Sequence, residues 1–320
     1  MHPLSHPLVI LLPVYEDLPA VSTLLAMIKR QCNERVHVVV VDDGSVSQPV
    51  TTALFQEAEV DGTLVTLKRT VGHQKALSIG LNTLASRLTD NAHVVIMDSD
   101  GEDPPEAIPE LVELLESDDV DIVVAARGER VETTRFKIFY WLYKRLFHLL
   151  SGKTIDFGNF MALKPRAVAR IAVMPETSTH VAAGVLASKL RITSQPVDRT
   201  ARISGHSKMN FVGLTLHGFR ALMVFADAVL VRVGIASLST GVLATLGVVI
   251  ALVLKSMGHA TPGWFSVVSG ILFLVVTQTT MLALLLLMIT GLTRREEIAP
   301  LGSYDAYIEK VSEHRCQVEP

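Results

Sequence analysis

Four carboxylates follow a short apolar run near residue 100, and they are the residues of this chain best suited to chemistry. The run is Val94–Met97, and the acids are Asp98, Asp100, Glu102 and Asp103. An apolar run of this kind indicates a buried strand, and the carboxyl end of a parallel strand is where open α/β sheets bind ligands. Clustered carboxylates repel one another unless a cation lies between them. Mg²⁺ or Mn²⁺, itself bound to phosphate oxygens, would fill this place.

A second interpretation of the same motif is purely structural. The acids would then form a solvated loop in which Asp103 caps a helix that starts at Pro104. Short motifs of this kind occur by chance, so the spacing alone does not decide between a metal-diphosphate site and a capped loop.

The elements that would position these acids alternate between apolar runs and helical patterns. Alternation of this kind predicts an α/β fold with a mostly parallel sheet and helices on both faces. The predicted strands are 8–14, 36–41, 64–67, 93–97 and 120–125, and the predicted helices are 18–30, 50–57, 74–87 and 106–116.

Polar residues also follow the other predicted strands. They are Pro13 to Asp17 after the first strand, Asp42 to Ser45 after the second, and Ala126 to Gly128 after the fifth. Each group alone is an ordinary turn or helix cap. Together they lie at one edge of one sheet, which favours a binding site there.

A charged segment, residues 127–137, follows the last of these strands. A run of charges is most often a solvated loop. The alternative is a mobile lid that supplies cations to a phosphate.

Two long uncharged runs lie in the last third of the chain. Val233–Leu254 and Trp264–Thr293 contain 22 and 30 residues, and at about 1.5 Å per residue the shorter reaches roughly 33 Å, enough to cross a bilayer. A buried pair of core helices is the alternative. Arginines flank the pair on the side of the preceding domain, so the positive-inside rule predicts that both termini are cytoplasmic. We expect no signal peptide, because the first residues lack a basic start and an apolar core.

Composition excludes some function classes. The chain has 320 residues and a net charge of -3, so nothing indicates nucleic acid as a partner. The mean hydropathy of +0.39 is high for a soluble enzyme. Cys32 and Cys316 have no metal-binding spacing, and we expect free thiols in a reducing compartment.

Read together, the strand-end motifs resemble those of family 2 glycosyltransferases with a GT-A fold. More narrowly, the chain is similar to polyprenyl-phosphate glycosyltransferases of the dolichol-phosphate mannose synthase and GtrB-like group. The resemblance rests on an ordered set of segments followed by two apolar helices. The segments are Leu12–Asp17, Val41–Ser45, Arg69–Ala76, Asp98–Glu106, Asp156–Phe160, Pro175–Glu176 and Arg202–Lys208.

Three features depart from the family's pattern. Glu16-Asp17 stands where Asn-Glu is usual, and Glu102 stands where Gln is common. Residues 177–188 lack the usual Arg-Phe and Trp. These departures concern the contacts to the base, the metal and the sugar, respectively.

The resemblance implies a nucleotide-sugar donor and a polyprenyl-phosphate acceptor, with UDP favoured over GDP. The donor nucleotide would contact Pro13, Tyr15, Asp17, Asp42, Asp43 and Asp98. Mg²⁺ or Mn²⁺ would be held by Asp98, Asp100 and Glu102 and would offset the charge that develops on the leaving nucleotide.

The acceptor phosphate needs cations more than a base, because its second pKa is about 6 and it is largely dianionic near neutral pH. The residues expected to bind it are Arg127, Lys137, Arg202, Ser207 and Lys208, with Arg130 and Arg135 next. The expected catalytic residues are Asp100, Asp156 and Arg127, and in-line attack would invert the anomeric centre. Asp156 is either a base or orienting carboxylate or a structural cap. His73 and His180 lie near the expected site by family position, although a single histidine is more often structural.

The predicted organisation has four parts. Residues 1–208 form the GT-A domain, 209–232 amphipathic juxtamembrane helices, 233–293 a transmembrane hairpin of about 233–254 and 266–290, and 294–320 a cytoplasmic tail. Residues 209–225 would lie along the bilayer surface or pack on the domain. Such a protein resides in the cytoplasmic membrane, and the resemblance suggests a homotetramer. The alternatives are a membrane polysaccharide synthase of the same superfamily and a non-catalytic nucleotide-binding scaffold.

Overall fold

The structure is a computed structural model that describes residues 4, 6–32, 36–127, 134–204, 211–259, 263–293 and 301–316. For residues 127, 134–140, 142, 211, 212, 214, 287 and 290–293 it describes the backbone only. The chain forms two compact units. The sheet unit comprises residues 1–140, 154–224 and 298–320, and the helical unit comprises residues 141–153 and 225–297.

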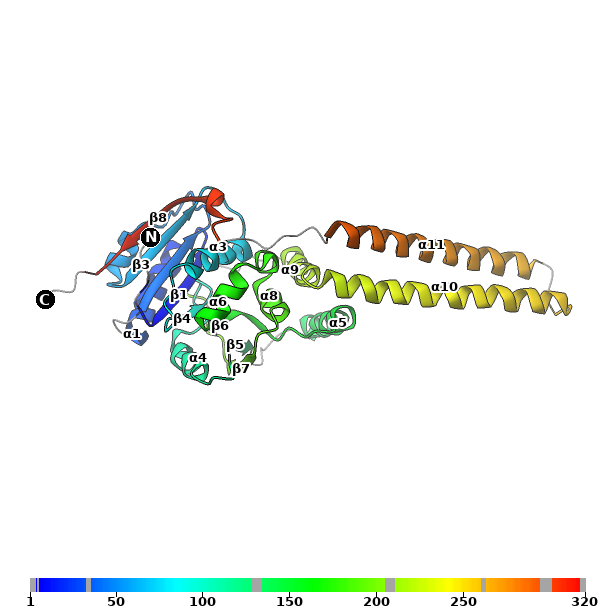
Figure 1. Cartoon of the computed structure of the whole chain (residues 1–320), viewed down its shortest axis with the longest axis horizontal. Helices are drawn as coiled ribbons and strands as arrows, with labels where there is room; N and C mark the ends of the chain where they lie inside the picture. The colour runs from blue at the N-terminus through cyan, green and yellow to red at the C-terminus, as the bar shows by residue number, and fades with distance from the viewer. Residues whose placement is uncertain are drawn as a thin grey trace. The chain divides into compact units, whose positions relative to one another are not determined.

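The sheet unit is built on one eight-stranded sheet with the order β7-β5-β6-β4-β1-β2-β3-β8 (Figure 1). The strands are β1 (Leu8–Val14), β2 (Val36–Asp42), β3 (Asp61–Leu67), β4 (His93–Ile96), β5 (Ile122–Arg127), β6 (Phe157–Leu163), β7 (Ile192–Val197) and β8 (Ile308–His314). Neighbouring strands from β4 to β3 are parallel, as are β5 and β7, whereas β6 and β8 run antiparallel to their neighbours. The α/β fold with a mostly parallel sheet is confirmed.

Helices cover both faces of this sheet. They are α1 (Leu18–Cys32), α2 (Ala53–Glu57), α3 (His73–Ala85), α4 (Ile108–Leu115), α6 (Pro165–Ala172), α7 (Pro175–Thr179) and α8 (Val181–Ala187), and α9 (Phe211–Met223) packs on α7 and α8. Because side chains alternate along a strand, Val9 and Leu11 of β1 enter a core with α3, α6 and α8, whereas Ile10 and Leu12 enter a second core with α1, α2 and α4. A strand buried on both faces must be apolar throughout, which is the pattern that the sequence shows.

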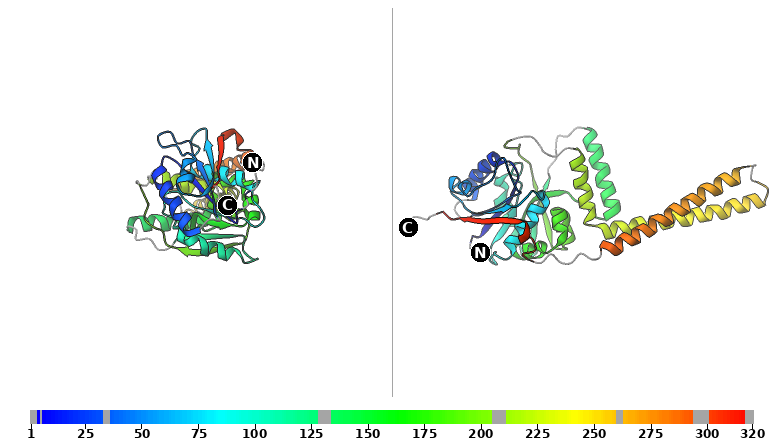
Figure 2. Two further views of the ribbon diagram at one scale, coloured as in Figure 1. Left: turned by 90° about the vertical axis from the view of Figure 1, so that its left-hand side faces the viewer. Right: turned by 90° about the horizontal axis from the view of Figure 1, so that it is seen from above.

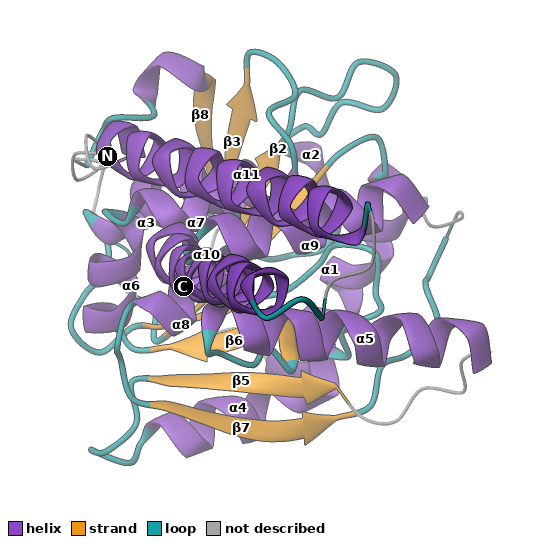
Figure 3. Cartoon of the chain, turned by 90° about the vertical axis from the view of Figure 1, so that its right-hand side faces the viewer, coloured by secondary structure: helices purple, strands orange, loops and turns teal. Residues whose placement is uncertain are grey.

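The strands β5, β6 and β7 extend the sheet beyond β4 (Figure 3). Ile96 of β4 pairs with Met161 of β6, and Ala126 of β5 pairs with Phe157 of β6. The beginning of β6 is therefore held between the carboxyl ends of β4 and β5. This register decides which polar residues meet at that edge.

The strand β8 follows the helical unit in the sequence, and it pairs with β3 of the sheet (red in Figure 2). Arg87, which is buried, pairs with Glu313 of β8, and Lys68 donates its backbone N–H to Tyr307. The residues that the sequence places in a tail thus include an ordered edge strand of the sheet.

The helical unit contains α10 (Ala226–Ser256), α11 (Trp264–Thr293) and the end of α5 (Thr134–Ser151). The buried residues of α10 are Ser237, Ala244 and Ala251, spaced by seven, and Gly247 approaches Leu272 of α11. Small residues at a seven-residue spacing let two helices pack closely side by side. Both helices are long and apolar enough to cross a membrane, with mean hydropathies of 2.2 and 2.0.

Candidate active site

The acidic residues after β4 form a loop that is closed by its own carboxylates. Asp103 accepts a hydrogen bond from the backbone N–H of Asp98 at 2.9 Å, and Asp100 accepts one from that of Glu102 at 2.9 Å. Asp103 is buried, and the helical turn after it begins with Pro104 as N-cap and without a side-chain cap bond. The interpretation of Asp103 as a helix cap is therefore wrong: its carboxylate closes the acidic loop.

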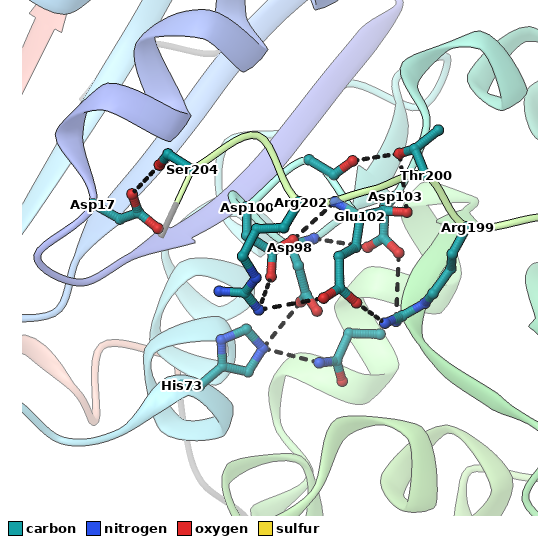
Figure 4. Close-up of polar contacts among 12 residues, drawn as sticks. Asp17, His73, Asp98, Asp100, Glu102, Asp103, Arg199, Thr200, Arg202 and Ser204 are labelled. Atoms are coloured by element: carbon teal, nitrogen blue, oxygen red, sulfur yellow. Dashed lines mark hydrogen bonds and ion pairs between the residues drawn. The ribbon is translucent and has the colours of Figure 1, made fainter. Parts of the chain in front are cut away.

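Two arginines face these acids from residues 199–204, here called the arginine segment (Figure 4). Arg199 lies 2.6 Å from Glu102 and 3.5 Å from Asp103. Arg202 lies 2.6 Å from Asp100 and 3.4 Å from Glu102. Glu102 thus holds both guanidinium groups, and each of them bridges two acids.

Backbone contacts fix the arginine segment on the acidic loop. Ile203 donates its N–H to the carbonyl of Asp100 at 2.9 Å, and Thr200 donates to that of Glu102 at 3.0 Å. Gly101 has φ +82, and a Cβ there would lie 2.4 Å from Ile203. Any other residue at 101 would be strained at this φ and would also require the Ile203 side chain to move, so glycine is strongly favoured here.

His73, the first residue of α3, approaches Asp98 from the other side. Its Nε2 lies 3.2 Å from Asp98 Oδ1 and 2.9 Å from the amide nitrogen of Asn159. When neutral, Nε2 accepts from Asn159; when protonated, it donates to Asp98. Asn159 belongs to β6, and the β4–β6 register brings it beside Asp98. Gln74 donates to Asn159 at 3.3 Å and accepts from the backbone of Val181 at 2.6 Å, which fixes this corner.

The cluster shifts the pKa values of its members in opposite directions. Burial alone would lower the pKa of His73, but the carboxylates of Asp98, Asp100 and Asp103 raise it above its ordinary value. Burial would raise the pKa of Asp98, but His73 and Arg199 hold it well below the usual range. Burial and the neighbouring Asp98 raise the pKa values of both Asp103 and Asp100. Burial is the larger cause of both rises, and the charge of Asp98 adds to it.

The donor chemistry of this cluster fits a hard divalent cation, because Asp98, Asp100 and Glu102 offer carboxylate oxygens. Oδ1 of Asp98 is buried and lacks a hydrogen bond of normal geometry. Among the described residues, however, no three His, Cys, Asp or Glu side chains are grouped as a metal site. The arginines occupy Asp100 and Glu102, so a cation bound there would have to displace Arg202.

Asp42 and Asp43, expected at the donor nucleotide, are both buried at the end of β2. Asp42 accepts the backbone N–H groups of Ser45 and Val50 at 3.0 and 3.2 Å. Asp43 accepts those of Val71 and Gly72 at 2.6 and 2.9 Å, together with the hydroxyl of Thr70 at 3.0 Å. Their carboxylates shape the loops at this edge, and their contact with a nucleotide stays a prediction.

The end of β1 lies beside these loops. Pro13 is buried opposite Val41, Tyr15 is exposed, and Asp17 accepts a hydrogen bond from Ser204 at 3.1 Å. Ser204 ends the arginine segment. The predicted base-binding residue Asp17 is thus tied to the same segment that covers the acidic loop.

The residues predicted to bind the acceptor are placed unevenly. Arg127 ends β5 and Asp156 precedes β6; because Ala126 pairs with Phe157, the two lie at the same end of adjacent strands. Asp156 is exposed. Lys137 lies on α5, with only its backbone described, and Ser207 and Lys208 lie outside the described residues. Arg202 has a placed side chain, and it contacts the acidic loop.

Two residues of this site, Arg199 and Asn159, were given no role from the sequence, and a third, Glu16, was noted only as a departure from the family's pattern. Arg199 pairs with Glu102 and Asp103, and Asn159 contacts His73. Glu16, which has φ 48, accepts the backbone N–H groups of residues 46–48 and so holds the loop after Asp43. The family comparison marks Glu16 as a departure, which is the signal that would have drawn attention to it.

His180 has a structural role. Its Nδ1 accepts the N–H of Ala183 at 3.2 Å as the N-cap of α8, and its ring lies 4.3 Å from that of His217 on α9.

A mixed, mostly parallel sheet with an acidic loop at its carboxyl edge defines the class of GT-A glycosyltransferase folds. The profile described as glycosyl transferase family 2 matches residues 9–171, about half of the chain. The protein belongs to this family.

Curated relatives and solved structures agree with this assignment. The chain is 26% identical over 212 residues to the undecaprenyl-phosphate 4-deoxy-4-formamido-L-arabinose transferase of Yersinia enterocolitica, covering 64% of this chain and 63% of that protein. It is 27% identical over 239 residues to the enzyme of the same name from Edwardsiella ictaluri, covering 69% and 71%. The match thus spans less than two thirds of the first relative's length.

A solved structure with the same fold is glucosyl-3-phosphoglycerate synthase from Mycobacterium tuberculosis in complex with Mn²⁺, UDP-glucose and phosphoglyceric acid. It superposes with a TM-score of 0.50 at 17% identity, covering 71% of this chain and 80% of that one. At this identity the likeness concerns the fold alone.

Proposed function

We propose that the protein transfers a sugar from a nucleotide-diphosphate sugar to a polyprenyl phosphate, with inversion at the anomeric carbon. The observation that carries the proposal is the acidic loop bridged by Arg199 and Arg202 at the carboxyl edge of the sheet. This arrangement places carboxylates for a cation and guanidinium groups for phosphates within one site.

On the donor side, Asp98, Asp100 and Glu102 would hold Mg²⁺ or Mn²⁺. When bound, the cation offsets charge that develops on the leaving nucleotide. His73 and Asn159 fix the orientation of Asp98. The loops held by Asp42, Asp43 and Glu16 would border the nucleotide, and exposed Tyr15 would offer a surface for the base.

On the acceptor side, the chain needs positive charge rather than a strong base. A phosphate monoester is largely dianionic near pH 7 and is its own nucleophile. Arg202 can fork toward phosphate oxygens once it leaves Asp100. Arg127 and Asp156, at the same strand ends, would orient the phosphate, together with Lys137, Ser207 and Lys208.

The acceptor lipid explains the apolar helices. On α9, Leu216, Phe219 and Met223 are exposed at a spacing that aligns them on one side of the helix. Such a stripe suits the surface of a bilayer. The helices α10 and α11 would then form the transmembrane hairpin.

The sheet supports a location of both chain ends on one side of the membrane. The chain leaves the sheet unit after β7 and returns to it as β8, which pairs with β3. A sheet lies on one side of a membrane, so the chain between β7 and β8 must cross it an even number of times. Together with the flanking arginines, this favours a hairpin in the cytoplasmic membrane with the sheet unit in the cytoplasm.

The relatives support a polyprenyl-phosphate acceptor, since the names of two of them state undecaprenyl phosphate. We propose UDP rather than GDP as the nucleotide and a divalent metal as cofactor, in keeping with the Mn²⁺ and UDP-glucose of the structurally similar synthase. The homotetramer remains part of this proposal.

The test incubates the purified full chain in detergent with undecaprenyl phosphate, Mg²⁺ or Mn²⁺ and a panel of labelled UDP- and GDP-sugars. Label that enters the organic phase identifies the donor. Asp100→Asn should reduce transfer at least a hundredfold, since it removes electrostatic stabilisation worth about 3 kcal/mol. Asp119→Asn, at a carboxylate that is 97% exposed, is the matched control. No labelled lipid with any donor would favour the non-catalytic scaffold instead.

A further inference from the structure

The end of α5 has an unusual partner. A helix leaves its last carbonyl groups without intrahelical partners, and a residue with positive φ often ends it. Here Gly152 has φ +74 and donates its N–H to the carbonyl of His148 at 2.8 Å. The carbonyl groups of the last helical turn can accept further hydrogen bonds, and a side chain of α10 donates them.

That side chain is Arg232. Its Nη1 donates to the carbonyl of Leu149 at 2.8 Å and to that of His148 at 3.3 Å. A cation at this end of a helix also interacts favourably with the helix dipole. The three residues belong to the helical unit, so the contact joins two elements of one compact body.

The neighbourhood is shaped to admit this guanidinium. A Cβ at position 152 would lie 2.2 Å from Nη2 of Arg232, so glycine provides the room as well as the backbone conformation. Beside it, the rings of Phe147 on α5 and Phe225 next to α10 meet edge to face at 6.0 Å. Hydrogen bonds, an aromatic contact and a glycine thus converge on one junction.

The position of Arg232 in the sequence places this contact at the beginning of the apolar part of α10. It directly precedes Val233, where the uncharged run of α10 begins. A guanidinium at the edge of an apolar span requires acceptors that lipid tails do not offer. The carbonyls of α5 are such acceptors, and exposed Trp141 and Leu149 on α5 suit the interface of a bilayer.

We propose that Arg232 is a positioning residue that pins the end of α5 to the first membrane helix and thereby holds the exposed face of Trp141 and Leu149 where the lipid of the acceptor enters from the bilayer. The proposal rests on the proposed function, because this face matters for catalysis only if the acceptor is a polyprenyl phosphate. All of these residues belong to the helical unit.

The experiment compares the full chain in lipid nanodiscs with the variants Arg232→Gln, Arg232→Lys and Gly152→Ala. Arg145→Gln is the matched control, because it removes the same charge from an exposed position of α5. Two readouts are taken: hydrogen exchange of the last turn of α5, and KM values for polyprenyl phosphate and for the nucleotide-sugar.

We expect Arg232→Gln and Gly152→Ala to speed the exchange of that turn and to raise the acceptor KM, each by about fivefold, the value of one helix cap. The donor KM should change less than twofold, Arg232→Lys should recover part of the loss, and Arg145→Gln should match wild type in both readouts. If hydrogen exchange of the last turn of α5 is unchanged in Arg232→Gln, the proposal that Arg232 holds this turn is wrong. Faster exchange with equal rises of both KM values would overturn the role in acceptor positioning. Hydrogen exchange can be measured without catalysis. A wild type without transferase activity would therefore refute the proposed function, while the exchange data would still test the contact between Arg232 and α5.

Discussion

A divalent cation bound at the acidic loop would compete with Arg202 for the same carboxylates, so removal of Arg202 should strengthen metal binding while impairing catalysis. In the structure its guanidinium lies 2.6 Å from Asp100 and 3.4 Å from Glu102. Both are carboxylates that the metal would use. Arg202→Gln removes the positive charge and keeps a polar side chain of similar reach.

The expected size follows from the burial of this pair. The side chains of Arg202 and Asp100 are 23% and 16% exposed, so water screens them only in part. Opposite charges about 4 Å apart attract by about 4 kcal/mol at an effective dielectric constant of about 20. Desolvation leaves a net value of about 1–2 kcal/mol. That difference corresponds to Mn²⁺ binding that is about 5- to 30-fold tighter in Arg202→Gln.

The full chain in detergent is titrated with Mn²⁺, with and without UDP, and calorimetry measures the heat of binding. The same variant should show a larger loss in polyprenyl-phosphate use than in nucleotide affinity. Arg145→Gln, on exposed α5, controls for a general change of charge. Binding of Mn²⁺ in Arg202→Gln that is equal to or weaker than in wild type would refute the competition. An equal loss of nucleotide affinity would refute the role of Arg202 at the acceptor.

Three further predictions concern the frame of the site. Gly101→Ala should lower the free energy of unfolding by about 1–2 kcal/mol and reduce transfer, because it strains a residue at φ +82 and crowds the Ile203 side chain. Thermal unfolding and transferase activity measure these effects, and a melting temperature equal to that of wild type would contradict the prediction. Glu313→Gln should cost about 1–3 kcal/mol, because it removes a carboxylate that pairs with the buried guanidinium of Arg87; urea unfolding measures it, with Glu309→Gln as an exposed control on β8. Burial, reinforced by nearby cations, lowers the pKa of His37 to about 4 from an ordinary value of 6.5, so its neutral form stabilises the fold fully above about pH 6.5. Between pH 6.5 and pH 5 the fold should lose about 2 kcal/mol, and His37→Gln should lose correspondingly less in urea unfolding at the two pH values.

The part of the fold that apolar runs specify was predictable from the sequence. The predicted strand 8–14 coincides with β1, and the other four predicted strands overlap β2 to β5. The strands β7 and β8 were not predicted, because they lack such runs; β6 was not predicted either, although it ends in the buried apolar run Phe160–Leu163. β7 contains Pro196 and several polar residues, and β8 reads Ile-Glu-Lys-Val-Ser-Glu-His with mostly part-exposed side chains. An edge strand needs an apolar residue only on its covered face, and its partner is far away in the chain.

Some residues of the candidate site could likewise be predicted from the sequence, and others could not. The acids were predictable, because several carboxylates in one short segment must share a cation or repel. Arg199 was not, because an isolated arginine in a polar segment shows its role only when folding brings it to Glu102, about a hundred residues earlier. Asn159 likewise depends on the register between β4 and β6.

The charge balance of the acidic loop explains why one site needs cations from so many parts of the chain. Asp98, Asp100, Glu102 and Asp103 face two guanidinium groups, with His73 as a third cation when protonated. A divalent metal would offset the remaining charge, but a donor diphosphate and an acceptor phosphate together bring about four negative charges. An arginine engaged by these carboxylates can therefore neutralise a phosphate only if it leaves its acid, which is the movement proposed for Arg202 at Asp100.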